Sequence, residues 1–287
     1  MNFFKAVADG FKIALTTRLS LVALSFFLWA SVLALAPIAI SAPIILMKIM
    51  NVSGIEEFLQ GAVFAAGTFI QYYLALAIVF VTASAWLDGT LAAGSAEFLK
   101  TRKANNEKAS KKALSKIADL LLATLAIIVI AITASVALSL GTTITLLKPV
   151  FALLRSLAGI LVGLLFFFTA YSIMIGNKKA FEALEESMQL FQKNALQVLL
   201  LLLATSILGT IIIILFALPL VFAFALSIVS TALSGGTTAF LSLFLVSLAT
   251  LILLTGLSLS QTLTAGITTS AYMQLKNTSR KRPSKKG

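Results

Sequence analysis

The chain has 287 residues and a net charge of +12, with 60% hydrophobic and only 11% charged residues. A soluble domain normally carries about 25% charged residues, so this composition excludes an ordinary soluble protein. The basic residues flank long apolar runs and lack aromatic stacking modules, which argues against nucleic-acid binding. The chain has no Cys and no His, which excludes disulfides, thiolate chemistry, Cys/His zinc sites and haem ligation by these residues.

Six segments are long and apolar enough to cross a hydrocarbon core of about 30 Å, which takes about 20 residues. The first four spans are predicted near 19–47, 58–87, 120–147 and 156–177. A last charge-free run divides at Ser234-Gly235-Gly236-Thr237-Thr238, where small residues suit a turn, into spans near 195–228 and 239–272. The sequence therefore predicts an all-α polytopic integral membrane protein with one six-span domain, 1–276, and a basic disordered tail, 277–287.

The distribution of Lys and Arg predicts the orientation of these spans. Nineteen of the 22 basic residues fall in the N-terminal segment, in the segments after spans two and four, and in the tail. Only Lys48, Lys148 and Arg155 fall on the opposite side. Because positive charge is retained on the cytoplasmic side, we expect a multi-pass protein of the cell membrane with both termini in the cytoplasm.

Spans one, three and five are each preceded by an amphipathic stretch that reads as a helix lying in the membrane interface. Apolar side chains recur at helical spacing in these three stretches: Phe4, Val7, Phe11 and Leu15; Ala109, Ala113 and Ile117; Phe181, Leu184, Met188 and Phe191. A helical hairpin follows each one. The pattern predicts three parallel copies of an interfacial helix plus a hairpin, arranged around a pseudo-threefold axis.

Three segments resemble a known family. These are 180–194 (AFEALEESMQLFQKN), 271–275 (AYMQL), and Asp88-Gly89-Thr90 followed by a basic amphipathic stretch. They look like uncharacterised six-span prokaryotic membrane proteins that are similar to the membrane domain joined to some glycerophosphoryl diester phosphodiesterases. The resemblance implies the six-span topology. It implies no activity, because the phosphodiesterase chemistry belongs to a separate soluble domain.

Polar and small residues form a stripe along one face of span six. Thr255, Ser258, Thr262, Gly266 and Thr269 share this face, and Gln261 lies beside it. One interpretation is a polar groove or cavity lining, for which the candidate residues are Thr255, Ser258, Gln261, Thr262 and Thr269. The other is interhelical hydrogen bonding and small-residue packing.

Span four carries two further features. Gly159 and Gly163 form a GxxxG element that permits close helix packing, either inside the bundle or between protomers. Arg155 comes closest to an ionisable group at membrane depth, and we interpret it as an interfacial Arg whose head reaches toward the headgroups.

The ten acidic residues all lie at predicted span ends or in connecting segments, which is typical of solvated helix faces. No catalytic or metal-binding constellation is present in the pattern, so we expect no enzyme activity, no cofactor and no metal. The leading hypothesis is a non-enzymatic membrane protein that binds or moves a lipid or another amphiphile. The alternative is a structural or assembly subunit. It would recruit a protein partner, or form a homo-oligomer, through the GxxxG face and the basic cytoplasmic segments.

Overall fold

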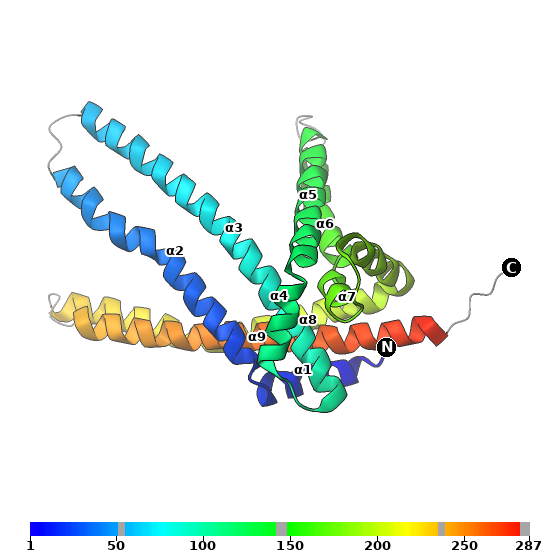
Figure 1. Cartoon of the computed structure of the whole chain (residues 1–287). Coiled ribbons are helices and arrows are strands. Elements are labelled where there is room, and N and C mark those ends of the chain that lie inside the picture. Colours follow the sequence, from blue (N-terminus) through cyan, green and yellow to red (C-terminus); the bar gives the residue numbers. More distant parts are fainter. Residues whose placement is uncertain (51–54, 142–147, 235–238, 282–287) are drawn as a thin grey trace.

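The computed structural model describes residues 1–50, 55–141, 148–234 and 239–281, and the regular elements in these ranges are helices (Figure 1). Five of them are long and apolar enough to cross a membrane, and α1 with α2, bent by 70°, adds a sixth. This confirms an all-α polytopic membrane protein. The helices are α1 (Phe3–Thr16), α2 (Leu19–Met50), α3 (Ile55–Thr101), α4 (Asn106–Ser115), α5 (Ile117–Gly141), α6 (Lys148–Leu165), α7 (Thr169–Met174), α8 (Ala180–Ser234) and α9 (Ala239–Lys281).

Several helices differ from the predicted spans. The predicted fourth span is divided into α6 and α7, and α9 continues past the predicted end at residue 272 to Lys281, so the first residues of the predicted disordered tail are helical. Helix α3 continues past the predicted end at residue 87 to Thr101, because the chain beyond Asp88 remains rich in Ala and Leu. Helix α6 begins at Lys148, ahead of the predicted start at 156, because Pro149 is compatible with the first turn of a helix. The predicted turn at 235–238 lies outside the described residues.

The third interfacial helix is the first part of α8. Asn194 has non-helical backbone angles (φ −138°, ψ 33°) and separates an amphipathic segment, 180–193, from the apolar remainder of the helix. The chain thus contains three similar units. They are α1–α2–α3, α4–α5–α6–α7 and α8–α9.

The three interfacial helices share a pair of small buried residues four positions apart. Such a pair lets another helix approach closely along one face. The pairs are Ala6 and Gly10 in α1, Ala109 and Ala113 in α4, and Ala183 and Ser187 in α8. Helices α1 and α4 also begin alike, because the side chains of Asn2 and Asn105 cap them by accepting from the backbone N–H of Lys5 and Lys108. Helix α4 therefore resembles α1 both in its pair of small buried residues and in its N-cap.

Each interfacial helix packs on the end of the preceding unit. Helix α4 packs on α3, the start of α8 packs on α7, and α1 packs on α9, which closes a ring of three units. The second span of each unit ends in a similar triplet, whose first residue is buried. The triplets are Ser95-Ala96-Glu97, Thr169-Ala170-Tyr171 and Ser270-Ala271-Tyr272. These contacts join the three helix-plus-hairpin units, and their pseudo-threefold arrangement stays a prediction.

The hairpins α2–α3, α5–α6 and α8–α9 diverge from this common junction (Figure 1). Helix α9 has 43 residues, which is about 65 Å of helix, whereas the hydrocarbon core is about 30 Å thick. A helix that is longer than the membrane is thick accommodates the excess by tilting. The diverging arms are consistent with such tilted crossings.

The packed core lies at the junction, and the arms face lipid. Tyr272, Phe168, Ile13, Leu19 and Leu91 are among the largest fully buried side chains, and all lie near the ring. Large apolar side chains are exposed along every arm, as expected for a lipid-facing surface. Examples are Leu33, Ile78, Val136, Leu153, Ile214 and Leu243.

Candidate functional site

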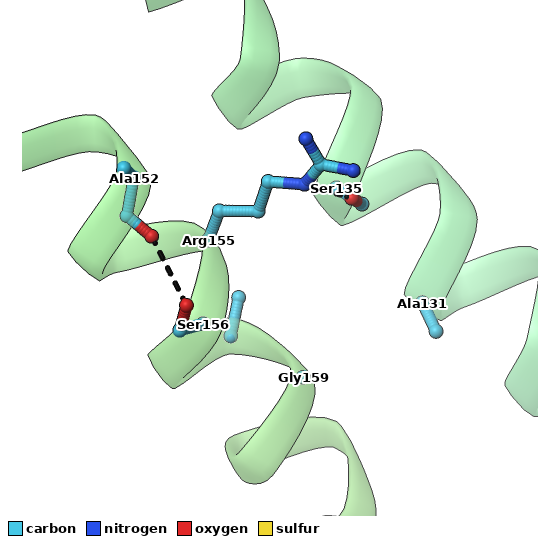
Figure 2. Close-up of a pocket in the computed structure, with 7 residues that line it drawn as sticks. Ala131, Ser135, Ala152, Arg155, Ser156 and Gly159 are labelled. Carbon is cyan, nitrogen blue, oxygen red and sulfur yellow. Dashed lines mark hydrogen bonds between the residues drawn. The ribbon is translucent and has the colours of Figure 1, made fainter. Parts of the chain in front are cut away.

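A groove of about 580 Å³ lies between α5 and α6 (Figure 2). Six of its seven lining residues are Ala, Ser or Gly, and their short side chains leave the space between the two helices open. The seventh is Arg155. The lining residues are Ala131, Ser135, Ala152, Arg155, Ser156, Ala158 and Gly159.

Arg155 extends from α6 toward α5, where its Nε donates a hydrogen bond to the hydroxyl of Ser135 at 2.7 Å (Figure 2). The side chain stays exposed and has no ion-pair partner within the described residues. Its two Nη groups remain available as donors. A guanidinium in this state favours a phosphate or carboxylate, which it can bind through two parallel hydrogen bonds.

The GxxxG element continues the same face of α6. A methyl group placed at Gly159 or Gly163 would have no neighbouring atom within 4 Å, so this face packs against nothing in the described part of the chain. Among the described residues, the element thus has no packing partner. Packing between protomers stays a prediction.

The predicted polar stripe of α9 lies mostly inside the junction. Ser258, Thr262 and Thr269 are buried, and Thr255 is half-buried. The hydroxyls of Ser258 and Thr262 donate to carbonyls of their own helix, to Thr255 O and Ser258 O, both at 2.8 Å. These side chains contribute to helix packing in this structure. A polar groove or cavity lined by the stripe stays a prediction.

Gln261 has a different role from the rest of the stripe, because its side-chain amide donates to Oδ1 of Asp88 at 3.0 Å. The bond joins α9 to α3. Sequence reasoning placed Asp88 at a solvated span end. In the structure its side chain is exposed, and it lies within α3, which continues to Thr101.

A second polar cluster joins α7, α8 and α9, and the sequence did not reveal it. Lys276 and Glu186 form an ion pair at 2.7 Å, with both side chains 20% exposed. The Tyr272 hydroxyl donates to Glu186 at 3.2 Å and accepts from Lys276 at 2.8 Å. Ser172 lies 3.3 Å from the same hydroxyl. Glu186 was expected on a solvated helix face, but it faces the ring because α8 packs against α7 and α9.

Comparisons of the chain with family models, with curated proteins and with solved structures give no match. The resemblance to six-span prokaryotic membrane proteins therefore stays an expectation from the sequence. The site has to be interpreted from its own chemistry.

Proposed function

We propose that this protein is a non-enzymatic membrane protein that binds a lipid or another amphiphile in the groove between α5 and α6. The observation that carries the proposal is Arg155, an exposed cation without an ion-pair partner in the described chain, at the wall of an open groove between two apolar helices. The ligand class that fits is an amphiphile with an anionic headgroup. A volume of about 580 Å³ falls in the range of about 300–1,000 Å³ that is usual for small-molecule sites.

The headgroup would bind at Arg155. Its guanidinium would pair with a phosphate, and the hydroxyl of Ser156 lies on the same helix within the groove. At present that hydroxyl donates to the carbonyl of Ala152 at 3.2 Å (Figure 2), a long bond that a phosphate oxygen can replace. These groups supply both the charge and the directional donors that phosphate recognition uses.

The acyl chain would lie along the glycine face of α6. Gly159 and Gly163 are four and eight residues beyond Arg155, which places them about 6 and 12 Å further along the helix axis on the same face. Because both positions are open, an alkyl chain can contact the helix backbone closely there. The lysine and arginine distribution predicts that Arg155 lies toward the external side, so the expected ligand is a lipid of the outer leaflet.

The non-enzymatic part of the proposal is supported by the partners of the acidic side chains at the junction. Asp9, Asp88, Glu97 and Glu186 each contact a side chain from another helix: Ser270, Gln261, Lys108 and Lys276, respectively. Such contacts give each of these carboxylates a structural role.

Native mass spectrometry of the gently extracted protein tests the proposal. We expect a stoichiometric phospholipid adduct on the natural chain and at least about a tenfold loss of that adduct in Arg155→Gln. Lys148→Gln is the matched control, because it removes a cation from the first turn of the same helix, outside the groove. Equal adducts on the natural chain and on Arg155→Gln would refute this site.

The open GxxxG face favours a second candidate function, an assembly subunit that pairs with another copy of the chain or with a protein partner. Since the chain has no Cys, Gly163→Cys introduces a single thiol on this face. Efficient cross-linking of two copies in native membranes, and its loss on adding Gly159→Leu, would support assembly. If Gly163→Cys forms no cross-linked dimer and the protein carries the lipid adduct, the result would support the leading proposal.

A further inference from the structure

A second cavity, of about 710 Å³, lies where α1 bends into α2 and where α3 turns into α4. It is distinct from the α5–α6 groove and shares no residue with it. Three cationic residues, Arg18, Arg102 and Lys103, line it together with the hydroxyl-bearing Thr16 and Thr17. By the distribution of basic residues, this corner of the protein faces the cytoplasm.

The two acidic residues at this cavity are already paired with lysines outside it. Glu97 forms an ion pair with Lys108 at 3.4 Å, and Glu107 forms one with Lys111 at 2.6 Å. Arg18, Arg102 and Lys103 have no ion-pair partner within the described residues. The cavity therefore has an excess of positive charge.

Hydrogen bonds fix the backbone at these three residues, while their side chains are exposed. Arg102 follows α3 directly and lies in the left-handed region (φ 59°), and its N–H donates to Phe98 O at 2.8 Å. The next turn is fixed by Thr101, whose hydroxyl oxygen accepts from Lys103 N at 3.3 Å. The Asn106 side chain donates to Arg18 O at 2.9 Å and joins the start of α4 to the bend after α1. A non-glycine residue in the left-handed region is uncommon, so the chain makes an unusual turn at Arg102.

The surroundings are also electropositive. Local desolvation, followed by repulsion from Lys100 and Lys116, lowers the pKa of Lys112 on the neighbouring helix. An anion that binds nearby would offset this repulsion.

We propose that this cavity binds a phosphate group at the cytoplasmic surface. The cavity offers two guanidinium groups and one ammonium group to the negative charge of the phosphate. Guanidinium groups also match the geometry of phosphate oxygens. The phosphate can belong to an anionic phospholipid headgroup or to a free phosphate. Both present the same chemistry to Arg18, Arg102 and Lys103. The site does not depend on the function proposed for the α5–α6 groove.

The test compares two triple variants of equal charge in an Arg155→Gln background, which removes the contribution of the groove. The site variant is Arg18→Gln, Arg102→Asn and Lys103→Gln, where Asn is chosen because it tolerates the left-handed backbone. The control variant is Lys5→Gln, Lys12→Gln and Lys193→Gln, which neutralises three exposed lysines away from the cavity. Thermal unfolding of each variant checks that it is folded.

Two probes distinguish the source of the phosphate. Inorganic phosphate is measured by equilibrium dialysis, and phosphatidic acid is measured by native mass spectrometry against diacylglycerol, which has the same acyl chains but no phosphate. We expect at least about a tenfold weaker binding in the folded site variant and less than about a twofold change in the control. Binding of phosphatidic acid alone would assign the site to a lipid headgroup, and binding of both probes would admit a free phosphate. Equal losses in the two triple variants, or no binding of either probe to the parent chain, would overturn the proposal.

Discussion

The hydroxyl of Ser270 donates to Oδ2 of Asp9 at 2.8 Å, which joins the last membrane helix to the first helix of the chain. A second bond, from Asn2 N to the side chain of Gln274 at 2.7 Å, lies further along the same two helices. Helix α1 of the first unit thus packs on α9 of the third unit. In the same way, α4 packs on α3 and α8 packs on α7. The three units are therefore held as a closed ring, and the hairpins extend from it.

The ring should be sensitive to any side chain added where α1 meets α9. A Cβ at Gly10 would lie 3.0 Å from the backbone nitrogen of Ile267 and 3.1 Å from the carbonyl of Leu263. Because backbone atoms cannot move aside cheaply, we expect Gly10→Ala to destabilise the fold by about 1–3 kcal/mol. Thermal unfolding in detergent, followed by tryptophan fluorescence, measures this change. Gly159→Ala is the control, since its Cβ would meet open space, and its Tm should be unchanged or slightly raised.

The bond between Gln261 and Asp88 should be measurable as a coupling between α9 and α3. We expect Gln261→Leu and Asp88→Leu each to lower the unfolding free energy, and the double-mutant cycle to give a coupling of about 1 kcal/mol. Asp88→Asn, which keeps an acceptor oxygen, should be milder than Asp88→Leu. Strictly additive effects would show that the bond contributes nothing to holding the units together.

Because Lys276 and Glu186 form an ion pair, we expect the single variant Lys276→Met to be less stable than the double variant that also carries Glu186→Gln. Lys276→Met leaves the Glu186 carboxylate without its cation in a half-buried setting, at a cost on the order of 2 kcal/mol. The double variant Lys276→Met, Glu186→Gln has no unpaired carboxylate at this position. It should therefore recover much of the unfolding free energy that Lys276→Met loses. Chemical unfolding in mixed micelles compares the two. A double variant that is less stable than Lys276→Met would contradict this account.

The predicted orientation can be tested without removing any native thiol, because the chain has no Cys. A thiol at Lys111→Cys in α4 should react with a membrane-impermeant maleimide only after the cells are opened. A thiol at Lys148→Cys, at the start of α6, should react in intact cells. The reverse pattern would place both termini outside.

The spans and the repeat could be predicted because both depend on local patterns. Apolar length determines which segments can cross a membrane, and the recurrence of apolar residues at helical spacing identified the interfacial helices. For the ring, the sequence predicted a pseudo-threefold arrangement of the units but none of the contacts between them. These contacts depend on which residues of distant segments meet, as Asp9 and Ser270 do, and a single sequence does not show such pairs.

The polar sites were harder to predict, because burial depends on tertiary packing. Gln261 was selected for the cost of placing an amide in lipid, and the structure supplies the partner, Asp88. Glu186 was assigned to a solvated helix face because it lies in a segment that connects two predicted spans. Arg155 was expected to reach toward the headgroups, and the groove beside it is formed by small residues on both α5 and α6. That combination becomes visible only when the two helices are placed side by side.

The most direct test of the proposed function is photo-cross-linking with a phospholipid that carries a photoreactive group in its acyl chain. We expect cross-linked peptides from the natural chain to concentrate on the α5–α6 hairpin around Gly159 and Gly163. Arg155→Gln should abolish this concentration, and Lys148→Gln should preserve it. Cross-links spread evenly over the three hairpins, and unchanged in Arg155→Gln, would contradict lipid binding in this groove.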